Sequence, residues 1–263
     1  MGKYLLVMLF VFCFATTLYA APIGITSEAD ARESELWPNK DLGLSVGFVA
    51  DRVDKRAIDI DDGEFEMDAL MLRIGVSAIN RFYLYVDIGE AQNMQYSCYV
   101  NNGTKVIYDH EDDLLFGIGL NALAYRWDNG LEVGVSGSYR KADMAPNEVN
   151  IEGVVYRKDE LDSVRNGEFT EWQVGCELAW KTDYFIPYIG MKYSDVEVDG
   201  DVTLSNIQYN ANGKNASNNI GAFLGFAITP TLPETYGKEQ LTINLEGRFI
   251  DEQAYTAGIS YKF

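Results

Sequence analysis

The sequence is poor in the residues that most catalytic and metal-binding chemistry requires. It contains a single histidine, His110, which excludes a zinc site of the HExxH type because that site needs two imidazoles. Its three cysteines cannot build a disulfide framework, and Cys13 lies in a segment that we expect to be removed. Basic residues number 21 against 40 acidic ones, so the formal charge of −19 disfavours a cationic nucleic-acid-binding surface.

The amino terminus has the pattern of a secretory signal peptide. A short basic start is followed by an apolar run over residues 4–16, and the small residue Ala20 is placed for cleavage before Ala21. The run is short for a membrane anchor, and polar residues follow it directly. We therefore predict three parts of the chain: a signal peptide at 1–20, an N-terminal linker at 21–40 and a folded unit at 41–263.

Period-two alternation dominates the rest of the chain, where no stretch reaches the ~18 apolar residues of a membrane helix. Leu70, Leu72, Ile74 and Val76, for example, alternate with small or polar residues. Each alternating segment has about the 9 to 11 residues that a tilted membrane strand needs. We predict ten strands, at 41–49, 70–78, 82–89, 114–125, 131–140, 171–181, 185–193, 219–228, 240–249 and 254–263.

Short and long connections alternate between these strands. Tight turns are expected at 80–81, 126–130 and 182–184. Long polar loops are expected at 51–68, 90–113, 141–170 and 194–218. Two later connections, 229–239 and 250–252, keep the up-and-down order. The pattern predicts an all-β fold, a transmembrane antiparallel up-and-down β-barrel of ten strands, with eight or twelve as the alternatives.

The apolar set of each strand faces outward in this prediction, because its partner set is the one rich in glycine and charge. Inward glycines leave space for the bulky Tyr83, Tyr85, Tyr188 and Phe223, or alternatively leave a thin channel. Charges kept away from lipid can pair across a narrow lumen. We expect a lumen charge network made of Arg73, Asp87, Glu132, Arg140, Glu171, Glu177, Lys181, Lys192, Glu246, Arg248 and Lys262.

Aromatic residues indicate the membrane boundaries. Trp172 and Trp180 lie on one face of a predicted strand, ~26 Å apart along it and ~20 Å apart along the membrane normal at a tilt of ~40°. This spacing suits two interfacial girdles, whereas aromatics in a sandwich core are the alternative. We assign the aromatic girdle to Trp37, Trp127, Trp172 and Trp180.

The carboxyl terminus ends on an aromatic residue, with apolar or aromatic residues at alternate positions before it. This segment resembles the carboxy-terminal assembly signal of Gram-negative outer-membrane β-barrel proteins, and the resemblance covers the signal peptide and residues 41–263. It assigns the assembly signal to Tyr255, Ile259, Tyr261 and Phe263.

The resemblance implies a place in the bacterial outer membrane after signal cleavage, with lipid, lipopolysaccharide and the barrel assembly machinery as partners. It implies no cofactor and no nucleic acid. It names no subfamily and leaves the oligomeric state open.

His110 lies in the charged run 109–113, and ten strands is also the count of the omptin proteases. Resemblance to that family would imply a paired-aspartate site opposite an Asp–His couple, but no opposed aspartate pair accompanies His110. We expect a surface histidine in a loop and no enzymatic activity, whether omptin-like or lipid-modifying.

The acidic segment 59–68 does not match an EF-hand, because Gly63 at the sixth place puts Ile58 and Ile60 at the first and third. We expect a solvated anionic loop, with a weak divalent site shared with lipopolysaccharide phosphates as the alternative. Cys98, in a loop, and Cys176, on the lipid face, should not reach one another.

Two functions follow from this reading of the residues. The first is a narrow porin for small solutes, suggested by the polar, glycine-rich lumen. The alternative is a structural or surface-interaction barrel with a plugged lumen, whose acidic loops bind ligands or lipopolysaccharide.

Overall fold

The computed structural model describes most of the chain after the predicted linker. The described residues are 42–58, 63–79, 81–100, 103–182, 184–198, 201–204, 207–210, 213–214, 218–229 and 240–263. The predicted signal peptide, the linker and Trp37 lie outside this set. Within it, no helix is long and apolar enough to cross a bilayer.

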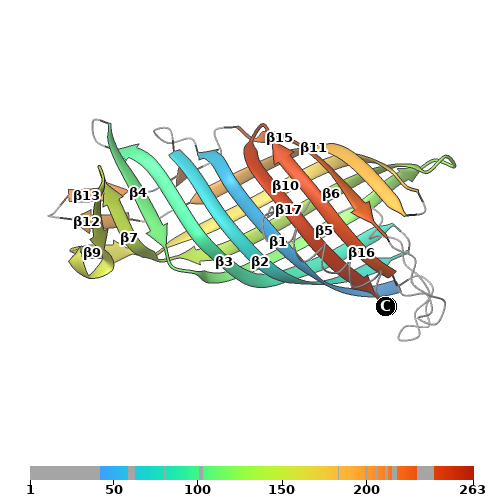
Figure 1. The fold of residues 1–263 in the computed structure, drawn as a ribbon, viewed down its shortest axis with the longest axis horizontal. Helices are drawn as coiled ribbons and strands as arrows, with labels where there is room; N and C mark the ends of the chain where they lie inside the picture. Colours follow the sequence, from blue (N-terminus) through green and yellow to red (C-terminus); the bar gives the residue numbers. More distant parts are fainter. Residues whose placement is uncertain are drawn as a thin grey trace, which may run out of the picture.

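Ten antiparallel strands close into a barrel (Figure 1). They are β1 (Leu42–Ile58), β2 (Gly63–Ala78), β3 (Phe82–Val100), β5 (Asp113–Arg126), β6 (Leu131–Met144), β10 (Gly167–Trp180), β11 (Phe185–Val198), β15 (Ile220–Ile228), β16 (Gln240–Phe249) and β17 (Glu252–Lys262). Their order around the ring is β2-β1-β17-β16-β15-β11-β10-β6-β5-β3, and β3 pairs with β2 to close it. The predicted fold class and strand number are confirmed.

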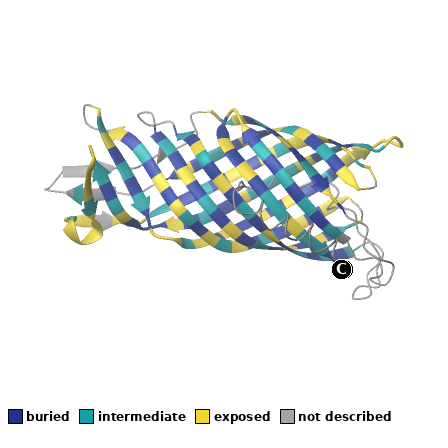
Figure 2. Cartoon of the chain, viewed as in Figure 1, coloured by how far each residue is buried: buried dark blue, intermediate teal, exposed yellow. Residues whose placement is uncertain are grey.

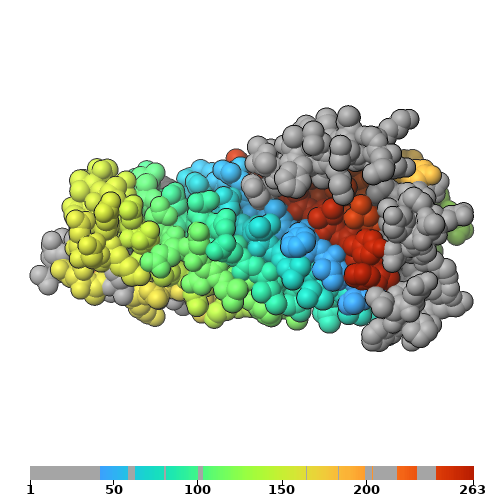
Figure 3. Space-filling view, turned by 60° about the horizontal axis from the view of Figure 1, so that its bottom comes forward, coloured from blue at the N-terminus to red at the C-terminus, as the bar shows by residue number. Residues whose placement is uncertain are grey.

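The first and last strands of the chain seal the barrel. β1 pairs with β17 from Ser45 opposite Lys262 to Arg56 opposite Glu252, and Figure 3 shows the two strands, coloured blue and red, side by side. We call the end of the barrel that carries the carboxyl terminus and the turns after β2, β5 and β10 the turn end. The opposite end, which carries additional strands, is called the extended end.

Alternate residues face outward and inward along each strand, which gives the checkerboard of burial in Figure 2. Phe48, Leu70 and Ile74 are outward and exposed, whereas the intervening Arg73 and Gly75 are inward and buried. The prediction that the apolar set faces outward is therefore confirmed for this part of the barrel. We call it the transmembrane section.

The alternation inverts toward the extended end. On β2 the outward series changes from Leu70 to Asp68 and Glu66, while Phe65 and Met67 are inward and buried. A membrane strand shows apolar residues to lipid, but a strand in water must turn them inward. The barrel therefore continues beyond the membrane as a water-soluble β-structure, which we call the extension.

The extension corrects the prediction of long polar loops. Segments assigned to loops at 51–68, 90–113, 141–170 and 194–218 are largely strands, because β1, β2, β3, β6, β10 and β11 run on and further strands are added. The additions are β4 (Thr104–His110), β7 (Pro146–Ile151), β8 (Val154–Arg157), the 3₁₀ turn η2 (Lys158–Glu160), β9 (Ser163–Arg165), β12 (Asp201–Leu204), β13 (Ile207–Asn210) and β14 (Gly213–Lys214). Figure 1 shows β4, β7, β9, β12 and β13 at its left.

An apolar core fills the extension. It includes Phe65, Met94, Tyr108 and Val196, and the rings of Phe65 and Phe169 stack with centroids 5.0 Å apart. Cys98 belongs to this core, buried on β3, so its assignment to a loop is wrong. At this level the inward face changes from polar to apolar and the outward face from apolar to polar. Both changes are expected where water replaces lipid around the barrel.

Glycines in the transmembrane section accommodate aromatic rings, which is one of the two alternatives that the sequence left open. A Cβ atom added to Gly75 would lie 2.2 Å from the Tyr83 hydroxyl, and one added to Gly119 would lie 2.2 Å from the Tyr85 ring. Gly225 accommodates Tyr188, and Gly190 accommodates Phe223, in the same way. These rings therefore occupy space on the inner face that a side chain at each glycine would take.

Candidate functional site in the lumen

Eight buried charged side chains meet in the lumen at the level where the alternation inverts. We call them the central network: Asp51, Arg56, Arg140, Glu171, Lys192, Arg248, Asp251 and Glu252. Four are basic and four are acidic, so the network is formally neutral. Because each charge loses its hydration on burial, such a cluster is tolerated only when its members pair and hydrogen-bond to one another.

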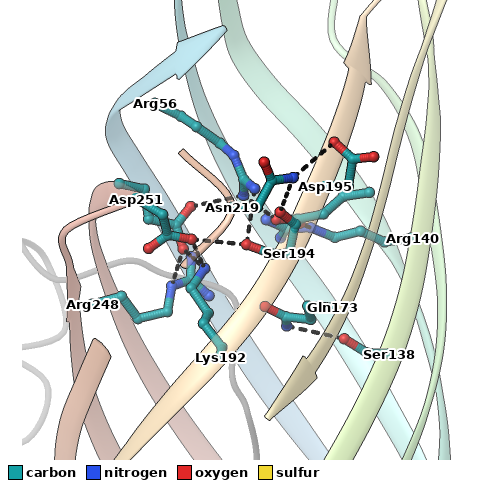
Figure 4. Close-up of polar contacts among 12 residues, drawn as sticks. Arg56, Ser138, Arg140, Gln173, Lys192, Ser194, Asp195, Asn219, Arg248 and Asp251 are labelled. Carbon is teal, nitrogen blue, oxygen red and sulfur yellow. Dashed lines mark hydrogen bonds and ion pairs between the residues drawn. The ribbon is translucent and has the colours of Figure 1, made fainter. Parts of the chain in front are cut away.

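Arg56 joins three strands of the barrel. Its guanidinium group pairs with Glu171 on β10, lies 3.2 Å from the Glu252 Oε2 atom on β17, and donates to the Ser194 hydroxyl on β11 at 2.9 Å. Its side chain is 1% exposed. Figure 4 shows Arg56 extending from its strand toward Ser194.

Arg140 and Arg248 extend the network to two more strands. Arg140, on β6, pairs through one nitrogen with Asp51 and through another with Glu171. Arg248, on β16, places Nε 2.7 Å from Glu252 Oε1 and Nη2 3.5 Å from Asp51 Oδ1. Asp51 and Glu252 are thus each shared between basic partners.

Lys192 completes the network from β11. Its ammonium lies 2.8 Å from Asp251 Oδ2 and also contacts Glu252. The Ser194 hydroxyl donates to Asp251 Oδ2 at 2.8 Å. Figure 4 shows Lys192 and Ser194 directed toward Asp251.

The network crosses the full width of the barrel. In the strand order, β1 and β10 are five positions apart in a ring of ten, so the Arg56–Glu171 pair connects opposite walls. The Arg140–Asp51 pair also connects non-neighbouring strands, β6 and β1. Side chains from opposite walls therefore meet within the lumen at this level.

A second ion pair lies on neighbouring strands. Arg73 donates two hydrogen bonds to Asp87, at 2.8 and 2.7 Å, and its guanidinium stacks 3.7 Å from the centre of the Tyr85 ring. A cavity of about 20 Å³, lined by these three residues together with Arg140 and Gln173, lies beside the pair. Such a volume suits roughly one water molecule and no larger solute.

Polar side chains continue toward the turn end. The Tyr188 hydroxyl lies 2.9 Å from Asn244 Oδ1 and 3.0 Å from Glu246 Oε2, and Arg126 pairs with Glu132 at 2.5 Å. A cavity of about 380 Å³ is lined by Arg126, Glu132 and Lys181 and by the turn after β5. A recess open to solvent, with charged groups on its wall, therefore lies beside this turn.

The structure divides the predicted lumen residues among several levels. Arg140, Glu171, Lys192 and Arg248 belong to the central network. Arg73 and Asp87 form the second pair, while the others lie toward the turn end: Glu132, Glu177, Lys181, Glu246 and Lys262. All eleven are buried except Lys181, which is partly exposed.

Sequence reasoning missed half of the central network. The sequence pattern predicts connections at four of its members: Asp51, Arg56, Asp251 and Glu252. In the structure, β1 continues to Ile58 and β17 begins at Glu252. Asp51 continues the inward series of Ser45 and Gly47, so that alternation was a usable signal. Arg56 gave no such signal, because the strand register shifts between Val53 and Arg56 and reverses the face.

His110 is not the surface histidine that the sequence predicts. It ends β4, is buried, and its Nδ1 atom lies 3.2 Å from the Met94 carbonyl oxygen. Burial lowers the pKa of His110 to about 4, against a smaller opposing effect of the Met94 carbonyl. The ring packs at the extended end because β4 pairs with both β3 and β7 there.

The described part of the acidic segment 59–68 is a strand rather than a loop. Gly63 to Asp68 belong to β2, with Glu64 and Glu66 outward. Within the described residues, no group of three or more His, Cys, Asp or Glu side chains is arranged to hold a metal ion. No disulfide joins Cys98 to Cys176, which faces outward on β10.

The girdle tryptophans of the described chain lie on the outer face. Trp172 and Trp180 are 43% and 58% exposed at the two ends of one outward series on β10. Trp172 packs against Tyr193, with centroids 5.5 Å apart, and Trp127 packs against Tyr125 at 4.6 Å. Two outward charged residues lie on the extended-end side of these rings: Asp195, two residues after Tyr193, and Glu168, four residues before Trp172.

The residues of the predicted assembly signal lie along β17. Tyr255 and Ile259 are outward and exposed, and the rings of Tyr261 and Phe263 meet edge to face at 5.0 Å. The Phe263 amide donates to the Leu44 carbonyl on β1 at 2.9 Å. The carboxyl terminus is therefore tied to the first strand at the seam of the barrel.

No protein-family model and no curated protein matches this sequence. Among solved structures, the chain is similar to the translocator domain of the autotransporter NalP from Neisseria meningitidis, with a TM-score of 0.48 and 10% identity over 84% of this chain and 88% of that one. It is also similar to the outer membrane protease OmpT from Escherichia coli, with a TM-score of 0.39 and 7% identity over 84% and 92%. For the outer membrane protein OprG from Pseudomonas aeruginosa, the TM-score is 0.34 and the identity 9% over 85% and 95%.

Proposed function

We propose that this chain is an integral outer-membrane barrel whose lumen is closed at rest and which acts through its extension at the cell surface. The apolar outer face of the transmembrane section and the aromatic residues at its two boundaries support the membrane location. In this orientation the turn end faces the periplasm and the extension faces outside, after export and cleavage of residues 1–20.

The central network is the observation that carries the closed lumen. Its ion pairs connect opposite walls of the barrel, and its members are almost completely buried. The apolar core of the extension lies beyond it, where an open aqueous pore would need polar walls. Ions moving along the axis would meet both barriers.

The outer rim of the transmembrane section suits contact with lipopolysaccharide. Lys141 faces outward near the level where the alternation inverts, with Tyr139 and Trp172 on the adjoining surface, and Arg52 faces outward near the same level on the opposite wall. Arg52 pairs with Asp54, and Lys141 with Glu168, so both signs of charge border the headgroup region. Basic groups there can meet lipid phosphates, while the aromatic rings lie at the interface.

Conductance of the purified wild-type protein in planar lipid bilayers tests the closed lumen. We expect no stable conductance steps, whereas steady ohmic steps would refute the proposal and favour a narrow porin. The recess of about 380 Å³ at the turn end, with Arg126, Glu132 and Lys181 on its wall, is the observation that favours this second function.

Labelling of intact cells with an impermeant thiol reagent tests the orientation. Asn147→Cys, on the exposed surface of β7, should be labelled, and Asn129→Cys, in a turn at the other end, should not. The native Cys98 is buried, and Cys176 faces lipid, which lowers the background. Labelling of the Asn129→Cys variant alone would show that the orientation is the reverse of the one proposed.

A further inference from the structure

In the part of the chain that the structure describes, three neighbouring strands of the barrel stop short at the extended end, although β14 pairs with β11 beyond β15 there. β16 and β17 are joined by only two residues, Ile250 and Asp251. β1 continues to Ile58 beyond the pairing of Arg56 with Glu252, and β11 continues to Val198 beyond the pairing of Tyr193 with Ile220. The strands β15, β16 and β17 therefore end at the level of the central network, while their neighbours rise above it.

The side chain of Asp251 points from this short turn into the lumen. We call the space that it occupies, between Lys192, Ser194 and Gly221, the socket. The Asp251 carboxylate lies 2.8 Å from the Lys192 ammonium and accepts a hydrogen bond from Ser194 at 2.8 Å. A Cβ atom added to Gly221, on β15, would lie 2.0 Å from Asp251 Oδ1. Only glycine leaves room for the carboxylate at that position.

Ile250 adopts a conformation that its side chain disfavours. Its φ is +88°, in the left-handed region that is an outlier for a β-branched residue, and its apolar side chain is 66% exposed. Such backbone strain persists where surrounding contacts hold it, and it collects at switch regions. The seated Asp251 on one side and the Asn218 amide, 3.5 Å from the Ile250 carbonyl, on the other supply those contacts.

We propose that the turn formed by Ile250 and Asp251 is a latch on the lumen. This inference rests on the closed lumen proposed above. When Asp251 leaves its socket, the turn relaxes, Lys192 loses one of its two carboxylate partners, Ser194 loses its acceptor, and water enters at the low side of the barrel. The route passes beside the apolar core of the extension, and its charged, glycine-bordered entrance suits inorganic ions and small polar solutes.

Two substitutions disturb the latch in different ways. Asp251→Ala removes the carboxylate, and Gly221→Ala fills the socket while keeping every charge. Gly247→Ala is the matched control on the same hairpin, because the atom nearest to its Cβ atom would be Tyr255 Cδ1, at an ordinary contact distance of 3.9 Å. Each protein is first tested for the heat-modifiable gel mobility of a folded barrel and then recorded in planar bilayers in potassium chloride.

We expect at most rare openings in the wild type and in the Gly247→Ala control, and a total open time at least about tenfold greater in both latch variants. A wild type that conducts steadily would refute the closed lumen itself. Folded latch variants that stay as silent as the wild type would leave the closed lumen standing and overturn the latch.

Openings in the Gly247→Ala control at the level of the latch variants would also overturn the latch, because the hairpin would then lack a specific latch. If neither latch variant folds, the socket serves assembly rather than gating, and the proposal fails as well. Adding Ile250→Gly to the Gly221→Ala variant should shorten the openings, since glycine accepts the positive φ without strain.

Discussion

Replacement of Arg56 by methionine removes the one side chain that links β1 to β10 and β11 in the central network. The change deletes the contacts of the guanidinium with Glu171, Glu252 and Ser194. Methionine keeps a similar length and apolar stem, so the main effect is the loss of one positive charge. The network changes from neutral to a net charge of −1.

The expected cost follows from burial. Breaking a buried pair by removing one partner typically costs ~3–5 kcal/mol, because the remaining charge stays buried. Glu171 keeps Arg140, and Glu252 keeps Lys192 and Arg248, so the lower limit of about 3 kcal/mol is expected here. The double variant Arg56→Met with Glu171→Gln restores neutrality and should recover about half of this loss.

The free energy of unfolding is measured by urea titration of the protein in lipid vesicles, with tryptophan fluorescence and gel mobility as the readouts. Lys55→Met is the matched control, since Lys55 directly precedes Arg56 on β1, faces the solvent and pairs with the exposed Glu64. We expect no measurable change for that control. A loss below about 1 kcal/mol for Arg56→Met, or a double variant no more stable than the single one, would show that water reaches the network and would refute the reasoning.

Three further outcomes are expected. Gly225→Ala should destabilise the barrel by about 1–3 kcal/mol in the same titration, because its Cβ atom would lie 2.4 Å from the Tyr188 ring, and a neutral result would mean that the ring is free to move. The low pKa of His110 predicts that stability is highest above pH 6.5 and falls as the pH drops toward about 4. The loss between pH 7 and pH 5 should be on the order of 2 kcal/mol and absent in His110→Gln, and equal pH slopes would contradict it. Deletion of Phe263 should lower outer-membrane levels by weakening recognition by the assembly machinery and the seam contact with Leu44, and wild-type levels of the heat-modifiable form would argue against this role.

The sequence alone predicts the transmembrane section well. Period-two alternation with glycine and charge on one face is sufficient to identify ten strands and to place Arg73, Tyr83 and Tyr188 inside. The reason is physical: lipid accepts only an apolar outer face, so each membrane strand carries a local signal of its orientation.

The extension could not be predicted by the same rule. Above the membrane the apolar face turns inward, and strands with charged outer residues, such as those around Asp68 and Glu90, look like polar loops when a membrane pattern is sought. The assignments of Cys98 and His110 to loops failed for this reason, since both are buried in strands of the extension.

The central network shows where sequence information ends. Asp51 follows the inward alternation of β1 and could have been placed from the sequence, whereas Arg56 turns inward only because the strand register shifts just before it. Its partners Glu171 and Glu252 lie 115 and 196 residues further along the chain. The sequence by itself determined which faces meet lipid, because that choice is made residue by residue. Only closure of the barrel decided which charges meet in the lumen, because pairing depends on which strands stand opposite one another.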